Sequence, residues 1–408
     1  MTIMSTHFTK PEHVPNELVV EFNIYNDARL KGDLHKQLMR MHADLPDIFW
    51  TPENGGHWII TRYELMDEVC KDHEHFSARG NYVPFQPEAM PMIPLNLDPP
   101  EHTYYRTMLL KHFSQGAIRN LEPRIEYWAK TLIDKVADKG HCEFMDDVGS
   151  LFPVSIFMEM MGLPLERLRE YRAIVVEYFG DTPRERWLEL QREITRQMME
   201  VIHARQDVPR NDMISKLLTD DIGGRRMTIP ELDALTNLLF QAGMDTVANF
   251  AGFFYRYLGL NPDLQKRIRE HPEEITDIVE EGFRLLGVVN NGRMLRQDRV
   301  VDGVAMREGE IIICMLPLAG LDERRNPDPQ DFKIDRPNRE HMLFSKGVHL
   351  CIGHTLARAE MRILLQKWFK RIPEFRISEG YTPLFRAGQV MGLSNLPLEW
   401  DASKVISG

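Results

Sequence analysis

Four cysteines, Cys70, Cys142, Cys314 and Cys351, are the side chains in this sequence best suited to bind a metal or act as nucleophiles. They lie far apart and form no Cys-x-x-Cys pair, so neither a disulfide framework nor a structural zinc site is indicated. A single cysteine is usually a small buried hydrophobic side chain, and we expect this of the first three. The surroundings of Cys351 predict a different role.

Cys351 lies directly before a helical pattern of apolar residues that continues to Pro373. The free N–H groups at a helix N-terminus stabilise negative charge, so we expect a lowered thiol pKa and a thiolate able to bind a metal. Gly347 and Gly353 flank the cysteine where a Cβ atom would obstruct a flat cofactor. The segment therefore predicts a cofactor held through the Cys351 sulfur.

A long helix carries a second group of chemically interesting residues. Thr228 and Glu231 form a capping box, and the apolar pattern that follows spans about thirty residues, or roughly 45 Å. In the middle of this helix lie Gly243, Asp245 and Thr246, which are poor helix formers. This local conflict predicts a functional kink.

Two charged pairs are expected to share helix faces. Glu281 and Arg284 are three residues apart, and the apolar residues around them indicate a half-buried pair. Asp98 is predicted to cap a helix that starts with the following prolines, which would place His102 and Arg106 on one face. From spacing alone, Glu281 and Arg284 could be an ordinary solvated ion pair, and His102 and Arg106 could be two solvated side chains on one helix face.

The segment around Cys351 resembles the signature of the cytochrome P450 haem-thiolate monooxygenases, Phe-x-x-Gly-x-His/Arg-x-Cys-x-Gly. The matching residues are Phe344, Gly347, His349, Cys351 and Gly353. The resemblance implies haem b (iron protoporphyrin IX), with the Cys351 thiolate as the ligand whose electron density favours O–O cleavage. It also implies that Phe344 packs beside the porphyrin.

The same resemblance assigns roles to residues elsewhere in the chain. The residues implied to bind the haem propionates are His102, Arg106, Arg293 and His349. Residues 242–246 resemble the family motif in which Ala242 and Gly243 leave room for dioxygen, and Asp245 and Thr246 deliver protons. The alternative for Thr246 is a hydrogen bond back to the Ala242 carbonyl. Glu281, Arg284 and Arg336 are implied to stabilise the cysteine loop.

The sequence is most similar to the bacterial camphor-hydroxylating subgroup, but it departs from that subgroup at Met90. A tyrosine that binds the camphor ketone is expected there, and its loss would cost about 1–3 kcal/mol, which argues against camphor. The implied substrate pocket consists of Tyr82, Met90, Leu238, Gln241, Val288, Val289, Gln389 and Val390. The polar Gln241 and Gln389 favour an oxygenated terpenoid or norisoprenoid, such as an ionone.

Helical spacing dominates the sequence, which predicts a mainly α fold with small β-sheets. The resemblance implies one P450 domain over residues 1–408, a triangular helical prism whose long central helix crosses the haem, with residues 1–20 as an extended segment. We expect residues 300–304 and 311–315 to pair as a hairpin, and a second pair to join Phe385 to residues 396–398. Trp58 lies in another expected strand.

The composition of the chain indicates where the protein acts and which partners it needs. The net charge of −11 argues against a nucleic-acid binder, and no apolar run indicates a signal peptide or membrane anchor, so we expect a cytoplasmic monomer. No flavin or iron–sulfur module is encoded, so an iron–sulfur ferredoxin and its flavoprotein reductase are implied partners, together with O2 and a small hydrophobic substrate. The basic patch predicted to bind the ferredoxin is Arg106, Lys111, His112, Lys346 and Arg358. A haem-thiolate peroxygenase or isomerase, or a haem sensor without turnover, are the alternatives.

Overall fold

The computed structural model describes residues 8–85, 87, 91–179 and 182–407 of the chain. Helices make up most of it. Their bounds are α1 Leu34–Asp44, α2 Tyr63–Lys71, α3 Glu101–Phe113, α4 Gln115–Ala137, α5 Leu151–Met161, α6 Leu168–Tyr178, α7 Arg184–Asp207, α8 Met213–Leu217, α9 Ile229–Leu260, α10 Pro262–Glu270, α11 Ile275–Leu285, α12 Leu316–Gly320 and α13 His354–Arg371. The predicted fold class, mainly α with small sheets, is confirmed.

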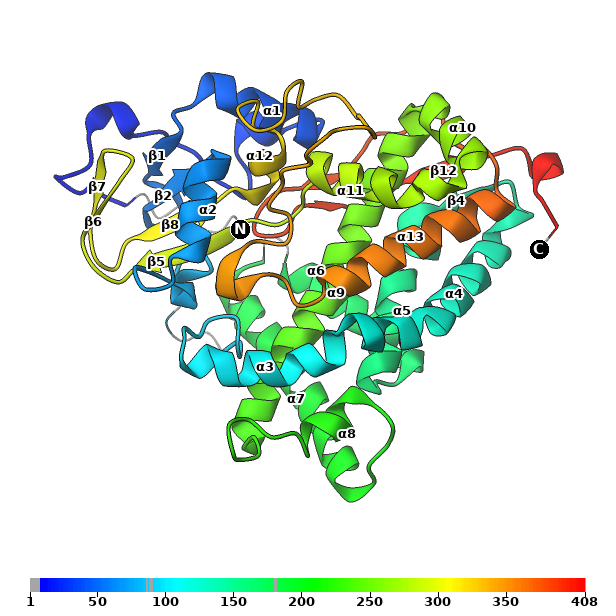
Figure 1. Cartoon of the computed structure of the whole chain (residues 1–408), viewed down its shortest axis with the longest axis horizontal. Helices are drawn as coiled ribbons and strands as arrows, with labels where there is room; N and C mark the ends of the chain where they lie inside the picture. The colour runs from blue at the N-terminus through cyan, green and yellow to red at the C-terminus, as the bar shows by residue number, and fades with distance from the viewer. Residues whose placement is uncertain (1–7, 86, 88–90, 180–181, 408) are drawn as a thin grey trace.

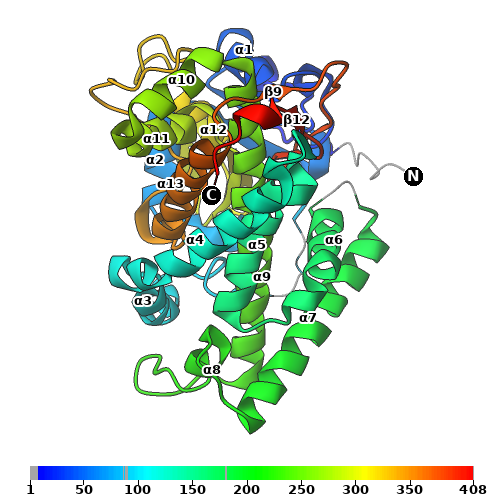
Figure 2. The same cartoon turned by 90° about the vertical axis from the view of Figure 1, so that its right-hand side faces the viewer.

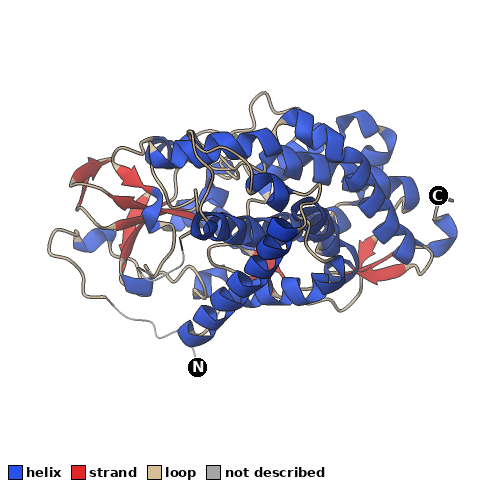
Figure 3. Ribbon diagram, turned by 90° about the horizontal axis from the view of Figure 1, so that it is seen from below, coloured by secondary structure: helices blue, strands red, loops and turns tan. Residues whose placement is uncertain are grey.

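Short strands form several small sheets. Their bounds are β1 Ile48–Thr51, β2 His57–Ile60, β3 Phe76–Ser77, β4 His141–Glu143, β5 Asn291–Leu295, β6 Arg299–Val301, β7 Val304–Met306, β8 Ile311–Cys314, β9 Arg376–Ile377, β10 Phe385–Arg386, β11 Gly392–Leu393 and β12 Pro397–Glu399. Among the described residues the largest sheet has the order β1-β2-β8-β5-β3. Figure 3 shows strands at two ends of the molecule, with helices between them.

The long helix α9 passes through the middle of the molecule. In Figure 1 it runs between the main sheet on the left and helices α4, α5 and α13 on the right, and the outline narrows to α8 at the bottom. Figure 2 shows the same helix from the side, with α6 and α7 beside it. The predicted capping box starts α9, because the Thr228 amide donates to Glu231 Oε2 at 2.7 Å and the Glu231 amide donates to Thr228 Oγ1 at 3.4 Å.

The predicted strand pairings are wrong in two places. Residues 299–306 form their own hairpin, β6–β7, which turns at Asp302 and Gly303, both with positive φ. Strand β8 pairs instead with β2, in parallel, and with β5, antiparallel. Phe385 pairs with Leu393, while β12 pairs with β4 and β9.

Helix α3 begins later than predicted, and Asp98 has a different partner. The helix starts at Glu101 with no side-chain cap. The Asp98 carboxylate accepts hydrogen bonds from the Ser77 hydroxyl at 2.6 Å and from the Ala78 amide at 3.0 Å. Asp98 therefore ties the start of α3 to β3, a long-range contact that a local capping rule cannot predict.

The N-terminal segment follows the edge of the main sheet from residue 8 onward. A 3-10 turn covers Asn16–Leu18, and the Val20 amide donates to the Trp50 carbonyl at 2.9 Å. Within the part of the chain that the structure describes, no helix is both long enough and apolar enough to cross a membrane.

Candidate active site

The loop that carries Cys351 is closed by its own backbone and packs closely on α2. The Cys351 amide donates to the Phe344 carbonyl at 2.8 Å, and a 3-10 turn covers Gly347–His349. Gly347 has a φ of +69°, and a Cβ atom there would lie 2.6 Å from the Cys70 carbonyl oxygen. Only glycine fits this position, so the backbone itself fixes the loop beneath the cavity.

The Cys351 thiol faces the cavity just before α13, as predicted, but its pKa moves the other way. The side chain is accessible from the cavity, yet it lies deep enough in the protein that burial raises the thiol pKa. The amides of Gly353 and His354 and the cation of Arg106 act in the opposite direction without overcoming burial. The other cysteines are buried, as expected.

A cavity of about 330 Å³ lies between the cysteine loop and α9. Cys351, Phe344 and Gly353 line it on the loop side, and Ala242 and Thr246 line it on the helix side. The structure thus brings together the cysteine loop and the middle of α9, which are far apart in the sequence.

A cluster of buried nitrogen atoms faces the same cavity without hydrogen-bond partners. His102 Nδ1 and Nε2, His349 Nε2 and Arg293 Nη2 are buried with no hydrogen-bond partner among the described residues. The two imidazole rings lie 4.4 Å apart between centroids. Arg106 also lines the cavity and donates to the Leu350 carbonyl. Buried donors of this kind call for an acceptor that the protein itself does not supply.

Burial and neighbouring cations keep both imidazoles neutral. Burial, reinforced by Arg106, lowers the pKa of His102 to about 4. Burial, reinforced by Arg293, lowers the pKa of His349 to about 2. An anionic group bound beside these side chains would favour the protonated imidazoles and so raise both pKa values.

Helix α9 supplies the opposite wall without a break. All residues from Ile229 to Leu260 are α-helical, so the predicted kink is not seen as an interruption of the helix. The Thr246 hydroxyl donates to the Ala242 carbonyl at 3.1 Å, which is the alternative contact considered from the sequence. A Cβ atom on Gly243 would lie 2.3 Å from Phe157 Cδ2, so this glycine lets α5 approach α9 closely.

Asp245 faces away from the main cavity, into a second one of about 70 Å³. Its carboxylate binds Arg386 Nη2 at 2.5 Å, and Asn249 lines the same small cavity. Burial raises the pKa of Asp245, and Arg386 opposes this effect. The sequence did not predict Arg386, since it lies 141 positions away and carries no motif.

The predicted substrate-pocket residues line the main cavity, except Met90, which lies outside the described residues. Those in the cavity wall are Tyr82, Leu238, Gln241, Val288, Val289, Gln389 and Val390. Sequence reasoning missed Met92, Phe179, Val247 and Leu316. No motif in the sequence marks Phe179, whereas Met92 is in the same segment as Met90 and could have been found.

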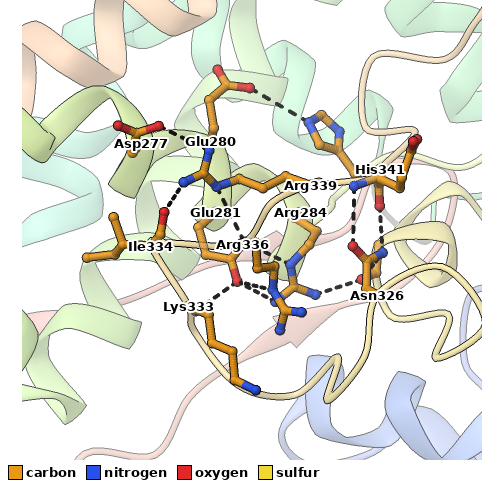
Figure 4. A network of polar contacts seen from close by, with 12 residues as sticks. Asp277, Glu280, Glu281, Arg284, Asn326, Lys333, Ile334, Arg336, Arg339 and His341 are labelled. Carbon is orange, nitrogen blue, oxygen red and sulfur yellow. Dashed lines mark hydrogen bonds and ion pairs between the residues drawn. The ribbon is translucent and has the colours of Figure 1, made fainter.

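Glu281, Arg284 and Arg336 form a fully buried cluster, where a half-buried pair was predicted (Figure 4). Arg284 binds both Glu281 oxygens, at 2.8 and 3.0 Å, and Arg336 Nε binds Oε1 at 2.9 Å. The guanidinium of Arg284 also donates to the carbonyls of Gly320, Pro329 and Asp331. The cluster therefore joins α11 and α12 to the loop before the cysteine segment.

Glu280, the residue directly before Glu281, forms a further ion pair that the sequence did not predict. Burial would raise the pKa of Glu280, but hydrogen bonds from His341 and Arg358 lower it to about 2. Arg358 Nε lies 2.6 Å from Glu280 Oε1, and its guanidinium lies over the Phe344 ring, 4.6 Å from the centroid. α11 is thus connected directly to α13 and to the cysteine loop.

Most members of the predicted basic patch are neutralised by acidic neighbours. His112 Nε2 lies 2.6 Å from Asp220, Lys346 Nζ lies 3.4 Å from Asp67, and Arg358 binds Glu280. Arg106 contacts the cysteine loop. The patch is therefore less positive than its composition predicts.

Comparison with known proteins gives a consistent result. The family model for cytochrome P450 matches residues 13–179 and 154–378. The chain is 34% identical over 400 residues to "Probable cytochrome P450 127A1" of Sinorhizobium fredii, with 96% of each chain covered. The crystal structure of CYP101J2 superimposes with a TM-score of 0.89 at 33% identity, covering 96% of this chain and 100% of that chain. CYP101C1 gives 0.88 at 29% identity, with the same coverage.

The chain belongs to the cytochrome P450 family. It is a cytochrome P450 monooxygenase of the bacterial, camphor-hydroxylase-like type, as the sequence predicted, and its cofactor is haem b. The residues present fit that cofactor: an accessible cysteine thiol lines one wall of the cavity, and the buried donors without partners match the two carboxylates of haem. A redox partner, O2 and a substrate follow from the family.

Proposed function

We propose that this P450 hydroxylates a small, neutral, hydrophobic substrate of the terpenoid or norisoprenoid class, such as an ionone, with electrons from a ferredoxin. The observation that carries the proposal is the largely apolar wall between Cys351 and Thr246, formed by residues such as Leu238, Val288 and Val390. Because the substrate must share this cavity with haem, we expect it to be small.

In this proposal Cys351 is the haem-iron ligand, and His102, Arg106, Arg293 and His349 bind the propionates. When bound, haem supplies the activation of dioxygen, and the thiolate donates electron density to the iron. The unpartnered nitrogens described above support the propionate assignment, because charge-assisted hydrogen bonds would satisfy them. Glu281, Arg284 and Arg336 stabilise the cysteine loop from behind.

Asp245 and Thr246 are proposed to deliver the protons that the reaction needs. Burial raises the pKa of Asp245, so its carboxyl holds a proton more readily than an exposed aspartate. The small cavity that it shares with Arg386 supports a route from solvent to this carboxyl. Thr246 lines the main cavity, and its hydroxyl can turn from the Ala242 carbonyl toward that space.

The ferredoxin is proposed to bind on the surface outside the cysteine loop. Leu350, directly before Cys351, is 38% exposed and accepts a hydrogen bond from Arg106. Among the described residues Lys111 is in no ion pair, so it remains a free cation of the predicted patch. We expect Lys111→Glu to slow electron transfer and to weaken its salt dependence. Lys31→Glu, remote in sequence, is the control, and equal rates for both variants would refute the docking proposal.

The ligand assignment is tested by the carbon monoxide difference spectrum of the reduced protein. We expect a thiolate-type band for the native protein and an imidazole-type band, or none, for Cys351→His. A thiolate-type band that survives in the variant would exclude Cys351 as the ligand. A native protein without such a band would overturn the proposed function as a whole.

Turnover distinguishes the proposed monooxygenase from its alternatives. Terpenoids and norisoprenoids are screened for low-spin to high-spin conversion, and hits are assayed for NADH consumption with a ferredoxin and its reductase. We expect Asp245→Asn to lower turnover by about 10²–10⁴-fold with little effect on substrate affinity. Product formed with peroxide but never with ferredoxin would indicate a peroxygenase, and binding without product would indicate a sensor.

A further inference from the structure

The Gln241 side chain is a buried polar group without a partner in an otherwise largely apolar wall. Gln241 lies on α9, is 3% exposed, and lines the main cavity. Its enclosed Oε1 atom has no hydrogen-bond partner among the described residues, and its Nε2 atom, the donor of the carboxamide, donates to none of them. Burying an unsatisfied amide is costly, so a carboxamide at this position needs an explanation.

Gln389, the other glutamine of the pocket, already has a structural role. Its Nε2 donates to the Asn81 carbonyl at 2.9 Å and to the Asn290 carbonyl at 2.7 Å. Both amide hydrogens are therefore used to join the C-terminal segment to the residue directly before β5 and to the loop after β3. Gln389 has no donor left for a ligand, which separates it from Gln241.

Tyr82 provides a second donor in the same cavity. Its hydroxyl donates to Met92 Sδ at 3.5 Å, and a thioether sulfur is a weak acceptor. Exchanging this sulfur for a carbonyl or ether oxygen would strengthen the hydrogen bond, and Met92 would keep its apolar contacts. The Tyr82 hydroxyl can therefore donate to a substrate oxygen in place of the Met92 sulfur.

We infer that Gln241 and Tyr82 are specificity-determining residues that together bind the single oxygen function of a neutral, mono-oxygenated hydrophobic substrate. The inference rests on the proposed function, because it concerns the substrate of the same cavity. A ketone or ether oxygen has two lone pairs, so it can accept one hydrogen bond from the Tyr82 hydroxyl and one from Gln241 Nε2. A hydrocarbon of the same shape leaves both groups unpaired, so the pocket selects against it.

The test compares ketones with hydrocarbons of the same skeleton. The probes are camphor with bornane, and β-ionone with its deoxygenated skeleton, titrated by the low-spin to high-spin change of the haem-loaded protein. We expect the native protein to bind the ketone of at least one pair about tenfold to a hundredfold more tightly than the hydrocarbon. Gln241→Leu and Tyr82→Phe should each lower that ratio by about fivefold or more and leave hydrocarbon affinity equal or improved.

Leu238→Met is the matched control, since it alters the same face of α9 without removing a polar group. It should leave the ketone-to-hydrocarbon ratio within about twofold. A native protein without preference for the ketone of either pair overturns the inference, as does a ratio unchanged in both polar variants. Failure of the proposed function is seen separately, as loss of the thiolate-type carbon monoxide band or of ferredoxin-dependent product.

Discussion

Replacing Glu281 with glutamine should destabilise the protein through charge alone, because the two side chains have nearly the same shape. Glu281 is fully buried and accepts four hydrogen bonds, two from Arg284, one from Arg336 and one from the Lys333 amide. Glu281→Gln leaves two buried guanidinium groups without a counter-ion and turns an amide donor toward other donors. Removing one partner of a buried ion pair costs about 3–5 kcal/mol.

The corresponding change in melting temperature follows from chain length. At about 2.1 cal/mol/K per residue, the unfolding entropy of a 408-residue chain is about 0.9 kcal/mol/K. The expected loss is therefore roughly 3–6 °C for the haem-loaded protein, followed by circular dichroism. Because we propose that the cluster stabilises the cysteine loop, part of the carbon monoxide band should also lose its thiolate character.

Lys333→Ala is the control for this experiment. The Lys333 ammonium forms exposed ion pairs with Asp328 at 2.7 Å and Asp331 at 3.5 Å, while its backbone amide, which binds Glu281, is kept. Such surface pairs contribute about 0–1 kcal/mol, so the melting temperature should change by roughly 1 °C or less. If Glu281→Gln melted within about 1 °C of the native protein, the argument from buried charge would be refuted.

Two further predictions concern stability. Burial lowers the pKa of His57 to about 3, because the neutral ring is favoured in the folded protein. The neutral ring therefore contributes fully to the free energy of unfolding above pH 6.5, and this contribution is lost as the pH falls toward 3. When the pH is lowered from 7.5 to 5, the free energy of unfolding in urea should fall by about 2 kcal/mol less for His57→Phe than for the native protein. Equal decreases in the two proteins would contradict a lowered pKa for His57. Gly243→Ala should cost about 1–3 kcal/mol, because its Cβ atom would meet the Phe157 ring at 2.3 Å. Gly116→Ala in α4, where nothing lies within 4 Å, should instead be neutral or stabilising in the same thermal assay.

The parts of the fold that could be predicted are those specified by neighbouring residues. The capping box of Thr228 and Glu231 fixes the start of α9 within one turn, and the glycines near Cys351 mark a loop before α13. Cys351 and the charged pair on α11 were found because their spacing is local. In each case the physical cause lies within a few residues of the group concerned.

What could not be predicted depends on contacts between distant segments. The carboxylates of Asp98 and Asp245 bind Ser77 and Arg386, which no spacing rule connects to them. Strand β8 pairs with β2, which is far away in the sequence, and with β5, which precedes the β6–β7 hairpin. The Asp302–Gly303 turn of that hairpin was overlooked as a hairpin signal. The thiol pKa of Cys351 also depends on burial, which a helix N-terminus alone does not reveal.

The pairing of β2 with β8 has a consequence for how the protein is made. The Trp58 indole donates to Glu310, 252 positions later, beside the parallel contact of these strands. At about 5–20 residues per second, the ribosome needs roughly 13–50 s to synthesise that interval. During this time β2 lacks its partner, and the segments with Arg293 and Cys351 have yet to emerge. Haem capture must therefore come near the end of synthesis, and until then the apolar strands of the early chain are exposed and prone to aggregation.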